Sequence, residues 1–261
     1  MSIIEAVILG ILQGLTEFLP VSSSGHLELG KIFMHIPEEG MAFTVAVHGA
    51  TILSTIVVFR NDIWQLIHGL FNFKWDDDTK YVAKIVLSMI PAVIVGLLFE
   101  AEIDAMFAGN LSFVASMLLV TGALLAFTHY AKPRTGGLTF RNAFIIGVAQ
   151  AIAIIPGISR SGSTIATGLL LGARKEDMAR FSFLMVVPLI LGANAKQMLD
   201  GGMTEMAQTE LIPVMAGFVA AFITGLLACT LMIKIVKQGK LIWFAYYCFA
   251  VGTIALTISF L

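Results

Sequence analysis

Two stretches of this sequence place polar and ionisable side chains within otherwise apolar runs, and the first lies near the N-terminus. It reads Gln13-Gly-Leu-Thr-Glu17-Phe-Leu-Pro-Val-Ser22-Ser23-Ser24-Gly25-His26. Gln13 and Glu17 are four residues apart and therefore share one face of a helix. Their side-chain oxygens suit a hard cation, Mg²⁺ or Ca²⁺, whose coordination shell would be completed by substrate oxygens and water. An interhelical hydrogen bond is the alternative for Gln13, whereas a carboxylate at membrane depth usually serves a substrate, ion or proton path.

The second stretch surrounds Arg160 with small and hydroxyl-bearing residues. It reads Pro156-Gly-Ile-Ser159-Arg160-Ser161-Gly162-Ser163-Thr164. The guanidinium of Arg160 can donate parallel hydrogen bonds to phosphate oxygens, and the glycines leave backbone N–H groups accessible at the start of a helix. These residue types favour an oxyanion site, while an ion pair between Arg160 and Glu17 that neutralises both is the structural alternative. We expect small residues of both stretches to bind the phosphate groups of a substrate: Ser22, Ser24, Gly25, Ser159, Ser161, Gly162, Ser163 and Thr164.

The elements that must position these stretches are membrane helices. Of the 261 residues, 58% are hydrophobic and 13% are charged, which leaves too little polar surface to dissolve a compact globule. The net charge of −1 gives no sign of nucleic-acid binding. Apolar runs of the length that crosses about 30 Å of hydrocarbon recur along the whole chain. They cover residues 3–21, 41–59, 82–100, 111–129, 143–173, 181–199, 211–236 and 241–260.

An internal repeat with a constant offset of 137 residues relates the two polar stretches. Its matched pairs include Gly10 with Gly147, Gln13 with Gln150, Ser22 with Ser159, Ser24 with Ser161, and Gly25 with Gly162. A weaker echo pairs Phe43-Thr44 with Phe181-Ser182 and Gly96-Leu-Leu with Gly225-Leu-Leu, and is short enough to arise by chance. Repeats in membrane proteins commonly place the binding site at the interface of the two halves.

The distribution of lysine and arginine decides whether the first segment of each half crosses the membrane, because these residues collect in cytoplasmic loops. If all eight segments crossed, the two sides would carry nearly equal numbers. If the segments 3–21 and 143–173 turn back, 13 of the 16 Lys and Arg residues lie on one side, with Lys31 and Lys196 opposite and Arg160 in its loop. The prolines within these segments favour the second arrangement, since they break a helix where protein can surround the irregular backbone.

We therefore predict an all-α integral membrane protein with six transmembrane helices and two re-entrant helical hairpins. The chain forms a single membrane domain, residues 1–261, in which 1–130 is the first repeat and 141–261 is the second, with inverted topology. The hairpins enter from opposite faces and meet near the middle, the termini face outward and the basic loops are cytoplasmic. No motif specifies the oligomeric state, and a homodimer is compatible with the sequence.

Both polar stretches resemble the signatures of the bacterial undecaprenyl-diphosphate phosphatases, also called bacitracin-resistance proteins. The likeness rests on the (Glu/Gln)-x-x-x-Glu spacing, on Leu-Pro-Val-Ser-Ser-Ser-Gly-His ending at His26, and on Pro-Gly-Ile-Ser-Arg-Ser-Gly-Ser-Thr ending at Thr164. It covers essentially the whole chain. The resemblance implies hydrolysis of undecaprenyl diphosphate to undecaprenyl phosphate and inorganic phosphate, at the outer side of the bacterial cytoplasmic (inner) membrane.

The same resemblance implies a cellular role and a cofactor. The product is the lipid carrier that is recycled for peptidoglycan and cell-wall synthesis, on which cell shape depends, and the activity confers bacitracin resistance. It also implies a divalent cation, Mg²⁺ or Ca²⁺. The family accepts glutamine in place of glutamate at Gln13, so direct ligation is less firmly expected there than at Glu17.

The expected mechanism combines the two stretches. Arg160 and a divalent ion near Glu17 would hold the diphosphate and offset charge that develops on the transferred phosphoryl group. Ser23 is the favoured nucleophile, and His26 or Glu17 handles the proton. Attack by water or by His26 itself is left open by the sequence. His48, in the segment 41–59, is a lesser candidate that is equally compatible with a buried polar contact.

The rival function is a transporter or flippase of a phosphorylated prenyl lipid. Inverted repeats with broken helices are the plan of many secondary transporters. Release of inorganic phosphate by detergent-solubilised protein, which has no two sides to transport between, separates the two functions.

Overall fold

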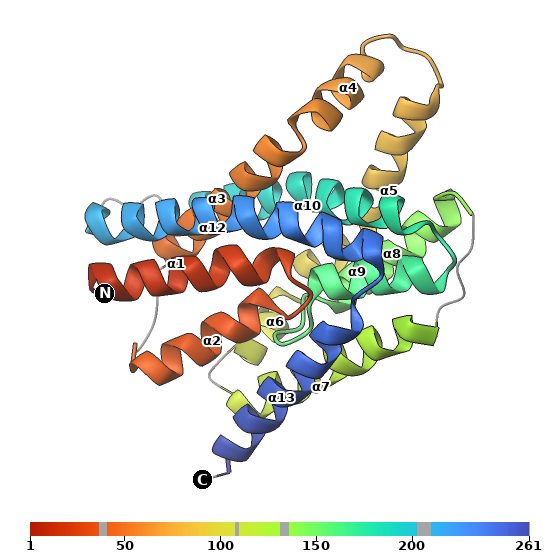
Figure 1. Cartoon of the computed structure of the whole chain (residues 1–261). Helices are drawn as coiled ribbons and strands as arrows, with labels where there is room; N and C mark the ends of the chain where they lie inside the picture. Colours follow the sequence, from red (N-terminus) through yellow and green to blue (C-terminus); the bar gives the residue numbers. More distant parts are fainter. Residues whose placement is uncertain (37–40, 108–109, 131–135, 203–209, 261) are drawn as a thin grey trace.

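The computed structural model describes residues 1–36, 41–107, 110–130, 136–202 and 210–260, and within these ranges it is built from helices (Figure 1). The first half contains α1 (Ile3–Phe18), α2 (Ser23–Met34), α3 (Met41–Val58), α4 (Arg60–Leu70), α5 (Asp77–Leu98), α6 (Glu100–Phe107), α7 (Leu111–Phe127) and the short η1 (Thr128–Tyr130). The second contains α8 (Phe140–Ile152), α9 (Arg160–Leu170), α10 (Lys175–Gln197), the π-helical turn η2 (Met198–Gly202), α12 (Leu211–Gln238) and α13 (Ile242–Ile258).

The structure is that of a multi-pass membrane protein. Among the residues that the structure describes, four helical stretches are long and apolar enough to span a membrane, namely Asp77–Leu98, Leu111–Tyr130, Lys175–Asp200 and Leu211–Gln238. A fifth span is formed if the bent pair α3 and α4 is counted as one. α13 is apolar throughout but has 17 residues. Each of the six segments expected to cross therefore coincides with a helix, and four of them meet the length and composition of a span on their own.

Two short helices were not predicted from the sequence. α4 continues the chain after α3 at an angle of 78°, and α6 follows α5 with acidic residues, Glu100 and Glu102, in its first turn. The apolar run of α3 ends at Arg60-Asn-Asp62, and these polar groups are costly within hydrocarbon. The chain therefore bends out of the bundle, as the orange helix in Figure 1 shows. Hydropathy alone finds spanning runs and misses such short flanking helices.

The breaks expected at the prolines are confirmed. α1 ends at Phe18 and α2 begins at Ser23, with Pro20 between them. The apolar segment 143–173 is divided into α8 and α9 by a loop that contains Pro156 and Gly157. In Figure 1 the α1–α2 pair enters from the left and the α8–α9 pair from the right, and their turns meet in the centre of the molecule.

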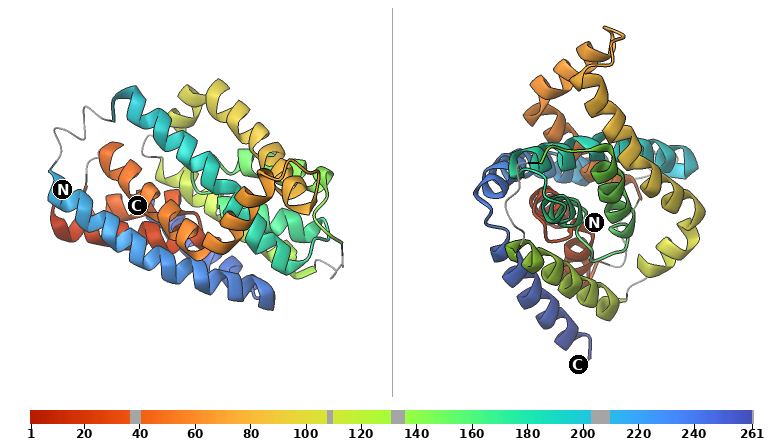
Figure 2. Two further views of the ribbon diagram at one scale, coloured as in Figure 1. Left: turned by 90° about the horizontal axis from the view of Figure 1, so that it is seen from above. Right: turned by 90° about the vertical axis from the view of Figure 1, so that its right-hand side faces the viewer.

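Close backbone contacts fix both pairs against long helices. A Cβ on Gly10 of α1 would lie 2.3 Å from the carbonyl oxygen of Gly217 on α12, and a Cβ on Gly147 of α8 would lie 2.4 Å from the carbonyl oxygen of Ser88 on α5. Small residues permit such approaches between membrane helices. Seen along the bundle, α1 and α9 lie in the centre, inside a ring of longer helices (Figure 2). This packing holds the two turns in one place.

Candidate active site

The two loops predicted to cooperate are in direct contact. The Ser161 hydroxyl donates to the carbonyl oxygen of Leu19 at 3.1 Å. A Cβ on Gly162 would lie 3.3 Å from Pro20, and one on Gly25 would lie 3.4 Å from the Cα of Gly157. The turns that follow α1 and α8 are thus packed backbone against backbone, and the glycines permit that approach.

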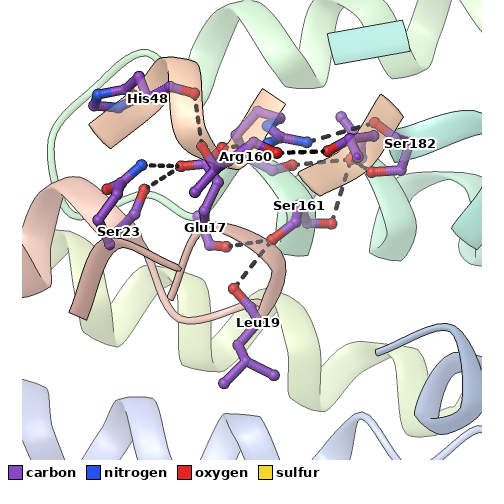
Figure 3. A network of polar contacts seen from close by, with 12 residues as sticks. Glu17, Leu19, Ser23, His48, Arg160, Ser161 and Ser182 are labelled. Atoms are coloured by element: carbon purple, nitrogen blue, oxygen red, sulfur yellow. Dashed lines mark hydrogen bonds and ion pairs between the residues drawn. The ribbon is translucent and has the colours of Figure 1, made fainter. Parts of the chain in front are cut away.

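Glu17 is the centre of the polar network at this junction (Figure 3). Its Oε2 atom accepts from the Ser23 hydroxyl at 2.8 Å and from the Gln13 side-chain amide at 3.2 Å. Its Oε1 atom pairs with Nη2 of Arg160 at 2.5 Å. Gln13 is fully buried, and the side chains of Glu17 and Arg160 are 8% and 15% exposed. The candidate nucleophile and carboxylate of the first loop are therefore joined to the arginine of the second, and the ion pair weighed as a structural alternative is present.

Arg160 is held on its other side by α10. Its Nη1 atom donates to the carbonyl oxygen of Ser182 at 3.4 Å, and the hydroxyls of Ser182 and Thr164 lie 2.6 Å apart. Ser182 and Thr164 are fully buried. The weak correspondence of Phe43-Thr44 with Phe181-Ser182 includes this serine, but it was too short to single Ser182 out from the sequence. Its position decides where the guanidinium points.

The second loop owes its shape to helix capping and to α7. Ser159 is the N-cap of α9, where its hydroxyl accepts from the Gly162 N–H at 3.1 Å, the arrangement that N-cap serines adopt. Thr121 of α7 accepts from the Ser159 N–H at 3.0 Å and donates to the Gly157 carbonyl at 3.1 Å. Gly157 has φ +92°, a conformation that L side chains rarely adopt. Thr121 lies within an apolar run, which is why the sequence did not reveal it.

Most hydroxyls predicted to bind phosphate in this loop have partners within the protein. Ser159 and Ser161 are 3.3 Å apart, Ser161 also bonds Leu19, and Thr164 donates to the Arg160 carbonyl at 2.9 Å. Ser163 is buried and makes no side-chain hydrogen bond to the described residues. The loop therefore places Arg160 at the site through a framework of its own hydroxyls.

The first loop uses the same cap with a different backbone. Ser22 is the N-cap of α2, and its hydroxyl accepts from the Gly25 N–H at 3.3 Å and lies 3.2 Å from the Ser24 hydroxyl. Ser22 has φ +69° and ψ +99°, which is unusual for a residue with a side chain and marks stored strain. Ser159, its counterpart in the second loop, has an ordinary φ of −75°. Strain is therefore present in the loop that carries Ser23.

His26 lies apart from the Glu17 network. Its Nδ1 atom is 2.9 Å from the Ser22 carbonyl oxygen and its Nε2 atom is 2.9 Å from the hydroxyl of Tyr247 on α13. Among the described residues it makes no hydrogen bond to Glu17, Ser23 or Arg160. Tyr247 was missed from the sequence because an aromatic residue in an apolar helix carries no local signal. His48 is half-buried, with Nδ1 2.9 Å from the Thr44 carbonyl of its own helix, and lies beside the network in Figure 3.

The donor set of the first loop fits a hard cation in part. Gln13 Oε1 is buried and has no hydrogen-bond partner among the described residues, and such an acceptor next to a carboxylate suits Mg²⁺ or Ca²⁺. In the part of the chain that the structure describes, no three His, Cys, Asp or Glu side chains gather into a metal site. Gln13 and Glu17 could thus hold a cation whose other ligands came from substrate and water.

This arrangement can carry out phosphoryl transfer. A hydroxyl faces a carboxylate that can accept its proton, and an arginine beside them can bind an oxyanion. The cavity at Glu17 and Arg160 measures about 10 Å³ and is also lined by Thr51 and Thr55 of α3 and by residues of α10. It has room for one water at most, so a phosphate would enter as Arg160 moves away from Glu17.

Comparison with known proteins identifies the family of this chain. The family model described as bacitracin resistance protein BacA matches residues 6–254. An undecaprenyl-diphosphatase of Christiangramia forsetii is 55% identical, with 100% of this chain and 99% of that protein covered. Proteins of the same name from Bacteroides fragilis and Methanococcus vannielii are 51% and 42% identical, covering 98% and 94% of this chain and 97% and 96% of their own lengths. The chain therefore belongs to the bacitracin resistance protein BacA family.

Proposed function

We propose that this protein is an undecaprenyl-diphosphate phosphatase, which hydrolyses undecaprenyl diphosphate to undecaprenyl phosphate and inorganic phosphate. The observation that carries the proposal is the contact of Glu17 with both Ser23 and Arg160, at 2.8 and 2.5 Å. The relatives, identical at half of their positions over their full lengths, bear the name of that enzyme. The product would return to cell-wall synthesis as the lipid carrier, and its recycling would confer bacitracin resistance.

In the proposed reaction Arg160 leaves Glu17 and donates to the terminal phosphate of the substrate. Glu17, released from that pair, accepts the proton as Ser23 Oγ bonds to the terminal phosphorus. The bond from that phosphorus to the bridging oxygen breaks, and undecaprenyl phosphate departs with the electron pair. Water then hydrolyses the phosphoserine and releases inorganic phosphate. Without substrate, the Glu17 carboxylate is engaged in its ion pair with Arg160. Substrate binding thus frees this carboxylate to act as the base.

Divalent cation dependence is part of the proposal. Mg²⁺ or Ca²⁺, when bound, would polarise phosphate oxygens as a Lewis acid. The residues that would hold it are Glu17 and Gln13, whose Oε1 atom accepts no hydrogen bond from the part of the chain that the structure describes. Ser163 of the second loop and Ser22, Ser24 and Gly25 of the first would contact the phosphate groups of the substrate once the cavity opens.

The membrane arrangement follows the same proposal. Six spanning helices and two re-entrant hairpins form inverted repeats, residues 1–130 and 141–261, with the site open to the outer side of the cytoplasmic membrane. The same N-cap hydrogen bond occurs in both loops, from the Gly25 N–H to the Ser22 hydroxyl and from the Gly162 N–H to the Ser159 hydroxyl. This recurrence supports the repeat. The approach of the hairpins from opposite ends supports it too (Figure 1). Lys132 and Arg134, which contribute to the positive charge of the cytoplasmic loops, lie outside the described residues.

An apolar groove provides a place for the prenyl tail. It holds about 570 Å³ and runs between α5, α6, α8 and the segment before Pro156. Apart from Glu102, its lining is apolar and includes Ile94, Phe99, Val148 and Ile155. Ile155 lies five residues before Arg160 along the chain, so the segment that lines this end of the groove leads into the second loop of the site.

The groove can be tested with substrates of two lengths. Val148→Trp should raise KM for undecaprenyl diphosphate more than for farnesyl diphosphate, because the short chain can avoid the filled part. Ile223→Trp, on the exposed face of α12, is the matched control. Equal effects of Val148→Trp on both substrates would exclude this groove as the tail site.

The deciding experiment for the activity is phosphate release from undecaprenyl or farnesyl diphosphate by purified protein in detergent, with and without a chelator. Wild type should release phosphate in the presence of Mg²⁺ or Ca²⁺, and Glu17→Ala, Ser23→Ala and Arg160→Ala should each lose at least about a hundredfold in kcat. Folded wild-type protein that releases no phosphate would reject the phosphatase and leave a lipid transporter or flippase as the function. Near-normal turnover by Ser23→Ala would assign attack to water or to His26.

A further inference from the structure

Two consecutive hydrogen bonds lead from Tyr247 of α13 to Ser22, the strained residue beside the candidate nucleophile. The Tyr247 hydroxyl lies 2.9 Å from His26 Nε2, and His26 Nδ1 lies 2.9 Å from the Ser22 carbonyl oxygen. The rings of His26 and Tyr247 are stacked, with centroids 5.6 Å apart and planes 12° from parallel. Ser22 precedes Ser23, whose hydroxyl donates to Glu17.

The partners determine the tautomer of His26. A carbonyl oxygen can only accept, so Nδ1 carries the proton that is donated to Ser22. In the neutral ring Nε2 then has a lone pair, and it accepts from the Tyr247 O–H. Both ring nitrogens are thereby occupied, and neither is directed at the Ser23 hydroxyl. In this arrangement Glu17, at 2.8 Å, is the group that can take the Ser23 proton.

The second loop provides a comparison, because it has the same N-cap but no histidine at the position that corresponds to His26. Its cap is the same, with Ser159 accepting from Gly162. The residue at the position of His26 is Ser163, whose backbone N–H bonds the Ser159 carbonyl at 2.8 Å. Its side chain adds no bond to that carbonyl, and the φ of Ser159 is −75°. In the first loop the Ser22 carbonyl accepts from both the backbone N–H, at 3.1 Å, and the ring of His26.

The positive φ therefore occurs in the loop whose carbonyl oxygen accepts from an imidazole, at Ser22. It does not follow from the N-cap hydrogen bond, because both loops have that bond. Rotation of the backbone at Ser22 determines the direction in which the next residue, Ser23, leaves the turn. Strained backbone persists where surrounding contacts hold it, and such contacts cluster at sites where a reactive group is held in position. His26 is buried, and the Tyr247 hydroxyl meets it from α13, a helix outside both hairpins.

We propose that Tyr247 is a positioning residue, which holds His26 as the Nδ1–H tautomer so that His26 clamps the strained Ser22 backbone and aims Ser23 at Glu17. His26 then acts through Ser22 and transfers no proton to or from substrate. The proposal rests on the proposed phosphatase function for its kinetic consequences, whereas the tautomer of His26 can be observed without turnover.

The kinetic test compares two neighbouring tyrosines. Tyr247→Phe keeps the stacked ring and removes the O–H donor, and should lower kcat about tenfold with KM nearly unchanged, the effect of one lost hydrogen bond at a positioned group. Tyr246→Phe, on the adjacent exposed side chain that packs edge-on to Trp243, is the matched control and should equal wild type. Wild-type kcat in Tyr247→Phe would overturn the proposal.

A second pair of variants separates positioning from proton transfer at His26. An Asn side chain can place an amide N–H near the location of Nδ1 but cannot titrate. His26→Asn should therefore retain far more activity than His26→Ala, and its kcat should show the same pH profile as wild type. If His26→Asn were as inactive as His26→Ala, and its pH profile lacked a limb that wild type shows, His26 would be the proton-transfer group. That result would reject the clamp.

The tautomer gives a readout independent of the reaction. In ¹⁵N spectra of histidine-labelled protein, with His26→Asn used to assign the signals, wild type should show a protonated Nδ1 and an unprotonated Nε2. Tyr247→Phe should shift the Nε2 signal while Tyr246→Phe leaves it in place. A wild-type ring protonated at Nε2 would refute the clamp. Wild type that releases no phosphate but shows the Nδ1–H tautomer would reject the enzyme function and retain the clamp.

Discussion

The backbones of Gly10 and Gly217 meet so closely that no side chain fits between α1 and α12. A Cβ added to Gly10 would lie 2.3 Å from the Gly217 carbonyl oxygen, well inside van der Waals contact. Glu17 lies about two turns further along α1, so this contact helps to hold the helix that carries the carboxylate.

Gly10→Ala should therefore destabilise the protein. The helices must separate to admit the methyl group, and overpacking of this kind costs about 1–3 kcal/mol. Gly96→Ala on α5 is the matched control, because no atom of the described residues lies within 4 Å of its added Cβ. Both substitutions raise the intrinsic helix propensity of the residue by the same amount. Thermal unfolding in detergent measures the difference. Equal melting temperatures for the two variants would show that the contact is looser than described.

Gly157→Ala should damage both stability and turnover. The residue has φ +92°, and its Cβ would lie 2.4 Å from the Val114 carbonyl oxygen. An alanine must leave this conformation, at about 1–3 kcal/mol, and would pull Ser159 away from Thr121 and so displace the neighbouring Arg160. Gly137→Ala, with open space around its Cβ, serves as control. Phosphate release and melting temperature are measured together, and a variant that keeps full kcat would show that the loop tolerates another backbone shape.

Arg160→Lys should lower kcat/KM by about 10²–10³-fold, the scale on which removal of a preorganised donor to an oxyanion acts. The guanidinium contacts Glu17 with one nitrogen and the Ser182 carbonyl with another, and a lysine ammonium is a single compact donor group that cannot reproduce this fork. Arg174→Lys, in a surface pair with Asp177, should behave as wild type. Steady-state kinetics of the two variants distinguish the requirement for a fork from a requirement for charge, since an active Arg160→Lys would indicate charge alone.

Gln13→Glu should lower the concentration of Mg²⁺ or Ca²⁺ needed for half-maximal activity. The change replaces the amide that donates to Glu17 with a second carboxylate, and two adjacent carboxylates favour a cation between them. Phosphate release is titrated against free cation for wild type and variant. A half-activating concentration that does not change would argue against cation binding at this pair.

Much of the fold followed from the sequence. Apolar runs predicted the long helices, and Pro20 and Pro156-Gly157 marked the breaks between α1 and α2 and between α8 and α9. Each of these signals is local, since hydropathy and proline act on the segment that contains them. The bend into α4 and the short α6 were not predicted, because their chain direction depends on where polar residues meet the membrane surface.

The sequence by itself determined the class of protein and which side chains could do chemistry. Ionisable residues are too costly in apolar segments to be there by default, so Glu17 and Arg160 were identifiable from their types, and Gln13 from its spacing to Glu17. Ser23 was favoured once its loop had been found to resemble that of a known family. The tertiary structure decided how they are joined. The Glu17–Arg160 pair links residues 143 positions apart, and His26 is bonded by Tyr247, which lies 221 positions further along the chain. Such contacts arise from packing of the hairpins and α13 in three dimensions, a relation that no local pattern of residues encodes.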